Sequence, residues 1–129
     1  MLRKSLLMCA AAVWLAFVTL FAIPEPSRAQ GPPRGKELFE KRCTGCHALD
    51  NEKEGPRLRG VYGRTSGSVS SFNYSDAVKK ARITWDAASL DKWLTDPDKL
   101  VPENDMSFQV AKADERADII AYLKQLSGL

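Results

Sequence analysis

Apolar residues recur at helical spacing close to the C-terminus of this chain. They lie three or four positions apart and therefore share one face of a helix; they are Ile119, Tyr122, Leu123 and Leu126. Asp114 is a suitable N-cap before this stripe, and Gly128 is a suitable residue to end the helix after it. The pattern predicts an amphipathic helix as the last element of the fold.

A second helical pattern precedes it. Leu90, Trp93 and Leu94 follow the same spacing, with Thr84 as a candidate N-cap. The Asp-Pro pair at 96–97 should end this helix, because the residue before a proline disfavours the helical conformation.

Two earlier helices are also predicted. Lys36–Cys43 indicates one, with Leu38 and Phe39 turned inward. Residues 75–80 indicate a short one, capped by Ser75. The predicted regular elements are thus all helices.

The segment between these two helices, residues 48–71, is different. Its apolar residues are sparse and follow neither the strand nor the helix period. Its glycines are Gly55, Gly60, Gly63 and Gly67. Irregular segments of this length are uncommon in a small domain unless they have a function, and wrapping a bound group is one such function.

The first 29 residues have the order of features of a secretory signal peptide. Arg3 and Lys4 give a positive start, Leu6–Ile23 is almost wholly apolar, and 27–29 offers small residues for cleavage. Cleavage there leaves one domain, residues 30–129. The apolar run spans 18 residues, enough to cross a bilayer, so an uncleaved anchor is the alternative. We expect cleavage, because the tether between this run and the folded part is short and would keep an anchored domain from reaching its partners.

The net charge of the chain excludes one class of function. The formal net charge of +3 becomes about +1 for residues 30–129, too little for a general nucleic-acid binder. Residues 31–82 contain eleven Lys or Arg against six Asp or Glu, whereas residues 83–129 contain five against nine. Either the two halves present a basic and an acidic face, or these charges are ordinary solvated surface.

One motif carries specific chemistry. Residues 42–47 read Arg-Cys-Thr-Gly-Cys-His, and a CxxCH run is typical of covalent attachment of a c-type haem. Cys43 and Cys46 share one side of a helical turn, so both sulfurs reach one porphyrin and the His47 imidazole binds its iron. Two other interpretations of these residues lack what they need. A thioredoxin-like redox pair would follow a strand, and no run of β-branched residues precedes Cys43. A structural zinc site would need a second pair of ligands. His47 is the only histidine of the chain, and the third cysteine lies in the N-terminal apolar run.

The group that fills the sixth coordination position of a haem iron decides whether the protein transfers electrons or binds ligands. Met106 is the one methionine of residues 30–129, and it lies in a proline-containing loop between two predicted helices. A lone methionine commonly fills a core, but the charged neighbours of Met106 make packing less natural. We expect Met106 to be the second axial ligand, which raises the reduction potential because a thioether favours ferrous iron.

Seven stretches occur in the order and approximate spacing of one family: GKELFEKRCTGCH, GPRLRGVYGR, FNYSDA, ITW, WLTDP, VPENDM and RADIIAYLK. Across residues 35–126 the chain resembles the class I cytochromes c of the soluble mitochondrial and bacterial type. The resemblance implies an all-α fold of about four or five helices around one covalent haem. It also implies that the first and last helices cross, with Gly35 and Phe39 against Ile119 and Tyr122.

The resemblance assigns further roles around the haem. The carbonyl oxygen of Pro56 accepts a hydrogen bond from the His47 ring nitrogen that does not bind iron, which fixes the orientation and basicity of the ring. Arg64, Tyr74 and Trp85 match residues that donate hydrogen bonds to the inner haem propionate. Without the resemblance, these three would be read as a surface arginine and two core aromatics.

Three places depart from the family pattern. Trp93 stands where many relatives have a tyrosine whose hydroxyl approaches the methionine sulfur, so that bond is either missing or made by the indole N–H. Val78 replaces a frequent asparagine of a buried polar network, which predicts a drier pocket. Residues 103–105 are Glu-Asn-Asp in place of the common Gly-Thr-Lys, which alters the turn and the charge of the ligand loop.

The sequence thus predicts a monomeric, diffusible one-electron carrier of the bacterial periplasm, not an enzyme. Its expected partners are redox proteins, namely a membrane cytochrome complex, an oxidase, a dehydrogenase or a reaction centre, and neither nucleic acid nor, after cleavage, a membrane. Candidate docking cations are Lys36, Lys41, Arg42, Lys53, Arg57 and Arg59. The alternatives are the same carrier on an uncleaved anchor, or a ligand-binding or peroxidase-like haem protein if Met106 is displaced.

Overall fold

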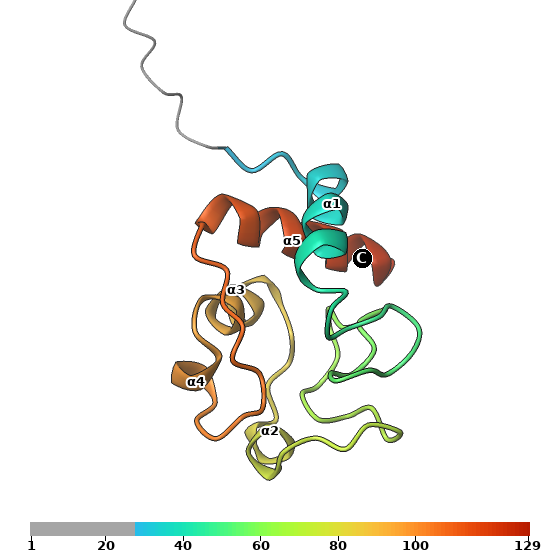
Figure 1. Cartoon of the computed structure of the whole chain (residues 1–129), viewed down its shortest axis with the longest axis vertical. Coiled ribbons are helices and arrows are strands. Elements are labelled where there is room, and N and C mark those ends of the chain that lie inside the picture. Colours follow the sequence, from blue (N-terminus) through green and yellow to red (C-terminus); the bar gives the residue numbers. More distant parts are fainter. Residues whose placement is uncertain (1–27) are drawn as a thin grey trace, which may run out of the picture.

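The computed structural model describes residues 28–129 (Figure 1). Its helices are α1 (Pro32–Arg42), α2 (Asp76–Ala81), α3 (Ala87–Thr95), α4 (Pro97–Leu100) and α5 (Ala113–Leu126). Strands are absent from this part of the chain apart from an isolated bridge between Thr65 and Thr84, so the all-α prediction is confirmed. None of these helices is long and apolar enough to span a bilayer. Nearly all of the predicted signal peptide lies outside the described residues.

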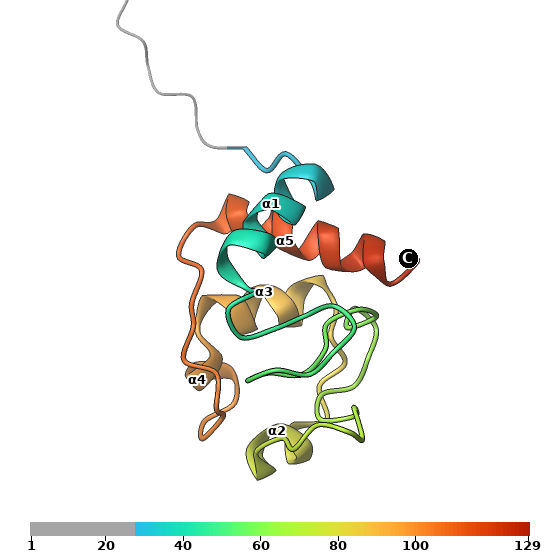
Figure 2. The same cartoon turned by 45° about the vertical axis from the view of Figure 1, so that its right-hand side comes forward.

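α1 and α5 cross at one end of the molecule, as both views show (Figures 1 and 2). Gly35 permits the close approach, because a Cβ there would lie 2.9 Å from the Cβ of Tyr122 and would collide with the carbonyl oxygen of Asp118. Phe39 is buried and its ring packs against that of Tyr122, with centroids 5.7 Å apart. Ile119 belongs to the same core cluster, so the predicted crossing residues are confirmed.

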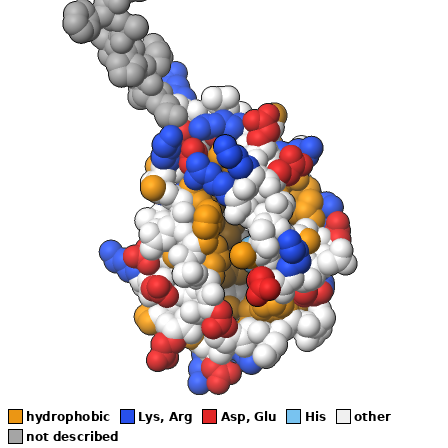
Figure 3. Space-filling view, viewed as in Figure 1, with side chains coloured by type: hydrophobic (Ala, Val, Ile, Leu, Met, Phe, Trp, Pro, Cys, Tyr) orange, Lys and Arg blue, Asp and Glu red, His pale blue; other side chains and the backbone are white. Residues whose placement is uncertain are grey.

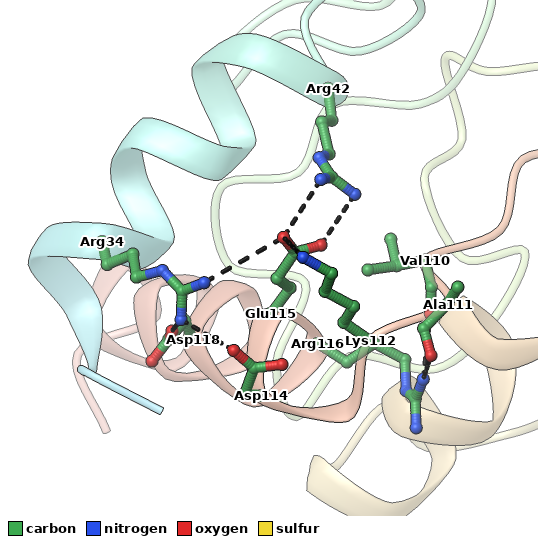
Figure 4. A network of polar contacts seen from close by, with 9 residues as sticks. All are labelled: Arg34, Arg42, Val110, Ala111, Lys112, Asp114, Glu115, Arg116 and Asp118. Atoms are coloured by element: carbon green, nitrogen blue, oxygen red, sulfur yellow. Dashed lines mark hydrogen bonds and ion pairs between the residues drawn. The ribbon is translucent and has the colours of Figure 1, made fainter. Parts of the chain in front are cut away.

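Charged groups also join these two helices (Figure 4). The Asp118 carboxylate is fully buried and accepts hydrogen bonds from the Arg34 guanidinium, at 2.8 Å, and from the backbone N–H of Gly31. Glu115 is buried too and pairs with Arg42 at 2.8 Å. Because buried carboxylates are costly unless they are paired and hydrogen-bonded, this network fixes the register of the crossing.

Two helix starts differ from the prediction, one because another side chain acts as the cap and the other because the predicted cap lies inside the helix. α3 begins after Asp86 instead of Thr84: the Asp86 carboxylate accepts from the Ser89 N–H, and the Ser89 hydroxyl oxygen accepts from the Asp86 N–H, both at 2.8 Å. Lys112 is the N-cap residue of α5, since Asp114 lies in the first turn and pairs with an arginine of α1.

The remaining ends follow the positions of proline and polar caps. α1 starts at Pro32, earlier than the predicted Lys36, because proline fits the first turn of a helix. α4 was not predicted; Asp96 caps it by accepting a hydrogen bond from the Lys99 N–H at 3.1 Å. Ser75 caps α2 as predicted.

The long segment between α1 and α2 has no regular element, as predicted, and closes one side of the molecule (Figure 2). Side-chain hydrogen bonds hold it in place. Ser66 is buried, and its hydroxyl donates to the Val78 carbonyl and accepts from the Ile83 N–H. Glu52 accepts hydrogen bonds from Ser71 and from Arg57, which links two distant parts of the segment.

Candidate functional site

The described residues surround a cavity of about 280 Å³. A hollow with apolar walls opens on the face shown in Figure 3. Its lining comes from α1, α2, α3, α5 and the segments between them. Every site residue predicted from the sequence contributes to this lining: Cys43, Cys46, His47, Pro56, Arg64, Tyr74, Trp85 and Met106. Val78 lines it as well, whereas the drier pocket that it suggests stays a prediction.

The two cysteines and the histidine reach the cavity because the chain keeps turning after α1. The backbone N–H groups of Cys46 and His47 both donate to the carbonyl of Cys43, at 3.1 and 2.8 Å. Cys46 is exposed at the cavity mouth, and Cys43 lies deeper. Burial raises the pKa of the free Cys43 thiol to about 11, although Arg42 opposes the shift. That side chain is therefore protonated at neutral pH when it carries no thioether.

The His47 ring is held from two sides. Its Nδ1 lies 2.8 Å from the carbonyl oxygen of Pro56, to which it donates when that nitrogen carries the proton. Nε2 then keeps the lone pair that a metal needs. Burial lowers the pKa of His47, opposed by this hydrogen bond and aided by Lys53, which favours the neutral ring. Gly55 packs so closely that a Cβ there would collide with the ring. Sequence reasoning missed this role of Gly55.

Met106 is also fixed at two points. The Trp93 indole Nε1–H donates to the Met106 sulfur at 3.1 Å, which answers the question that the sequence left open about this bond. The Asn104 side-chain oxygen accepts from the Met106 backbone N–H at 2.7 Å. The Asn104 amide nitrogen donates to Asp98 and to the carbonyl of Val101, each at 2.9 Å. The sequence marked Asn104 only as unusual, because no local pattern shows these partners.

Arg64 and Tyr74 add polar groups to the lining of the cavity. Arg64 donates to the carbonyl of Arg57 at 2.9 Å, and in residues 28–129 no ion pair joins it to a carboxylate. Burial lowers the pKa of Arg64, and Tyr74 opposes that shift. Burial also raises the pKa of Tyr74 while Arg64 lowers it. A half-buried cation beside a neutral phenol, with Trp85 in the same lining, suits an anionic group.

Residues 33–127 match the family model for cytochrome c. The cytochrome c of Euglena viridis is 50% identical over 96 residues, which cover 72% of this chain and 94% of that protein. The cytochrome c of Chlamydomonas reinhardtii is 44% identical over 99 residues, covering 74% and 88% respectively. The chain belongs to the cytochrome c family. The structure of cytochrome cH from Methylobacterium extorquens is similar with a TM-score of 0.70 and 38% identity, covering 74% of this chain and 98% of that one.

Membership in the cytochrome c family establishes the cofactor and the broad role. The protein binds one haem c covalently through Cys43 and Cys46, and it is an electron carrier that works with redox partners, not an enzyme. The observed cavity fits this group. Two cysteines, a histidine and a methionine line its apolar walls, and Arg64 and Tyr74 offer donors of the kind that a haem carboxylate needs.

Proposed function

We propose that this cytochrome c transfers single electrons through an iron held between His47 and Met106. One observation carries the proposal: the imidazole and the thioether come from segments far apart in the sequence, yet both line the cavity that receives Cys43 and Cys46. The haem supplies a one-electron iron couple, and a His/Met pair gives that couple a high potential.

The surrounding residues are arranged to hold the two ligands still. Pro56 and Gly55 orient the His47 ring, and Trp93 contacts the Met106 sulfur. We infer further that Arg64, Tyr74 and Trp85 bind the inner propionate. All three line the same cavity, the Trp85 backbone N–H donates to the Arg64 carbonyl oxygen at 2.9 Å, and Tyr74 is near enough to Arg64 to affect its pKa. A site whose ligands are held in this way needs little rearrangement when an electron enters or leaves, which is what a carrier requires.

Replacing Met106 tests the ligand assignment. Wild-type protein should show the visible spectrum of a His/Met haem c, and its reduced form should bind carbon monoxide poorly. Met106→Ala should lose the high potential and bind carbon monoxide readily. Ser107→Ala is the matched control, because Ser107 lines the same cavity and has no metal-binding sulfur. Carbon monoxide binding that is equally strong in wild type and Met106→Ala would instead favour the ligand-binding alternative.

We also propose that the carrier is exported to the periplasm, where it meets a membrane cytochrome complex, an oxidase, a dehydrogenase or a reaction centre as a monomer. The charged, apolar and small-residue regions of 1–29 support this location. Mass spectrometry of the native protein checks it. The expected mass is that of a chain starting at Gln30 plus one haem, whereas a full-length mass would establish the anchored form.

A further inference from the structure

The mouth of the cavity consists of those lining residues that are also exposed to solvent. These residues are Arg42, Cys46, Glu54, Asp105, Ser107 and Phe108. Because the haem belongs in this cavity, a redox partner reaches it most directly at the mouth. The charge and polarity of these side chains therefore decide which kind of partner fits.

Three residues of the mouth are charged, and the two that are unpaired are both carboxylates. Arg42 belongs to the network in Figure 4. That network joins three cations to three carboxylates, namely Arg34, Arg42 and Lys112 to Asp114, Glu115 and Asp118. Glu54 and Asp105, by contrast, form no ion pair within residues 28–129. The unpaired charge of the mouth is thus negative.

The two carboxylates come from different segments of the chain. Glu54 precedes Gly55, which packs against the His47 ring, and Asp105 precedes Met106. Both of these segments line the cavity. The negative charge therefore does not arise from a single acidic run.

An apolar side chain lies at the same mouth. Phe108 is 41% exposed, and in residues 28–129 the only other large apolar side chain that is exposed is Leu129 at the end of the chain. An apolar centre with a polar and charged rim is typical of protein–protein interfaces. Phe108 with Glu54 and Asp105 forms a small surface of this kind.

The cations that the sequence suggested for docking do not offset this charge. Of the six, only Arg42 lines the cavity. Three pair with carboxylates that are not part of the mouth, namely Lys36, Arg57 and Arg59. Lys53 lies next to Glu54, but its ammonium group donates to the carbonyl of Thr44. Lys41 is exposed and lies outside the lining.

We propose that the mouth of the cavity docks a redox protein that presents lysine or arginine side chains around an apolar contact. The inference deepens the proposed function and rests on electron transfer at this cavity. Glu54 and Asp105 attract the partner's cations, and Phe108 supplies the apolar contact. Complementary charges of this kind raise the rate of encounter and fix the orientation of the two proteins.

Oxidation of the reduced holoprotein by tris(phenanthroline)cobalt(III), a complex with three positive charges, tests the sign of the charge at the mouth. One electron passes from ferrous iron to cobalt(III), which gives ferric iron and cobalt(II), and no proton moves. At an ionic strength of about 0.01 M, Glu54→Gln and Asp105→Asn should each slow this reaction about twofold, and the double variant about fourfold.

Glu37→Gln is the matched control, because it removes the same charge at an exposed position of α1 outside the cavity lining. Its rate should stay close to that of wild type. Rates that fall equally in the three single variants, or in none of them, would overturn the proposal.

A binding measurement tests the partner's chemistry without electron transfer. Octalysine, a peptide of lysines alone, should shift the backbone NMR signals of Glu54, Asp105 and Phe108 in the holoprotein. Its affinity should fall several-fold in the double variant. Octaglutamate should leave these signals unchanged. Octalysine shifts confined to another surface, or a response to octaglutamate at the mouth, would overturn the proposal.

Ferricyanide, an anionic oxidant, separates this inference from the proposed function. If the wild-type protein exchanges electrons with neither ferricyanide nor the cobalt complex, the proposed function fails and the inference fails with it. If it exchanges electrons with both, and the substitutions at Glu54 and Asp105 change neither rate, only the docking inference is overturned.

Discussion

Glu103 shows how one residue of this cytochrome c bears strain. Its φ of 65° lies in the left-handed region, where a Cβ crowds the backbone. Its neighbour Asn104 compensates, since three hydrogen bonds from that side chain define the loop. The strain therefore persists because the surrounding contacts outweigh it.

Replacing Glu103 with glycine should stabilise the protein. The substitution removes the steric cost at positive φ, although glycine adds freedom to the unfolded chain, so the net gain should be about 0.5–1 kcal/mol. Denaturant unfolding of the holoprotein measures it. Asp105→Gly is the control in the same loop, since Asp105 is not among the residues with positive φ, and it should lose stability. A destabilised Glu103→Gly would show that the side chain makes an important contact.

At the site, the sequence predicted the residues whose chemistry is distinctive and missed those whose role is purely geometric. Cys43, His47 and Met106 stand out in the sequence because thioether formation and iron ligation need particular atoms; all three line the observed cavity, and iron ligation stays a prediction. Gly55 and Asn104 act through what lies next to them, a ring packed against a missing Cβ and three hydrogen-bond partners in the folded loop. Such roles depend on distances that no single-sequence pattern contains.

Among the elements, the crossing of α1 and α5 depends most on one small residue. A Cβ at Gly35 would meet the Asp118 carbonyl oxygen and the Tyr122 Cβ, both of which are held by a packed helix. Gly35→Ala should therefore destabilise the holoprotein by about 3 kcal/mol, at the upper end of overpacking costs. Thermal or denaturant unfolding measures the loss. Glu37→Ala, at an exposed position of the same helix, should have little effect, and equal behaviour of the two variants would contradict this crossing.

The elements themselves were predictable where their signals are local. The apolar stripe of α5 and the Ser75 cap of α2 are local, and both predictions are confirmed. The predicted start of α3 was wrong because the capping box at Asp86 is unusual: Ser89 stands where glutamate or glutamine is common. The prediction of Asp114 as the cap of α5 was wrong, because its carboxylate forms an ion pair with Arg34 of α1. A local cap of unusual composition decided the start of α3, whereas a partner distant in the sequence engages Asp114 at the start of α5.

For the whole molecule, the basic and acidic halves of the sequence partly neutralise each other. Arg34 and Arg42 of α1 pair with acidic residues of α5, which removes these charges from any separate face. Three other candidate docking cations are paired as well: Lys36 with Glu40, Arg57 with Glu52 and Arg59 with Asp50. Figure 3 shows basic side chains gathered above the hollow and acidic ones at its lower left. This mixed rim predicts only moderate dependence of electron-transfer rates on ionic strength.

Reversing one charge at the cavity mouth should strengthen that dependence. Asp105 is exposed and lines the cavity, so Asp105→Lys places a cation where an anionic oxidant approaches. Oxidation of the reduced protein by ferricyanide should become several-fold faster at an ionic strength of about 0.01 M, where the Debye length is about 30 Å, and should fall steeply as salt is added. Glu37→Lys makes the same change in net charge away from the cavity. Stopped-flow rates that rise equally in both variants would show that total charge, and not the rim of the cavity, governs the approach.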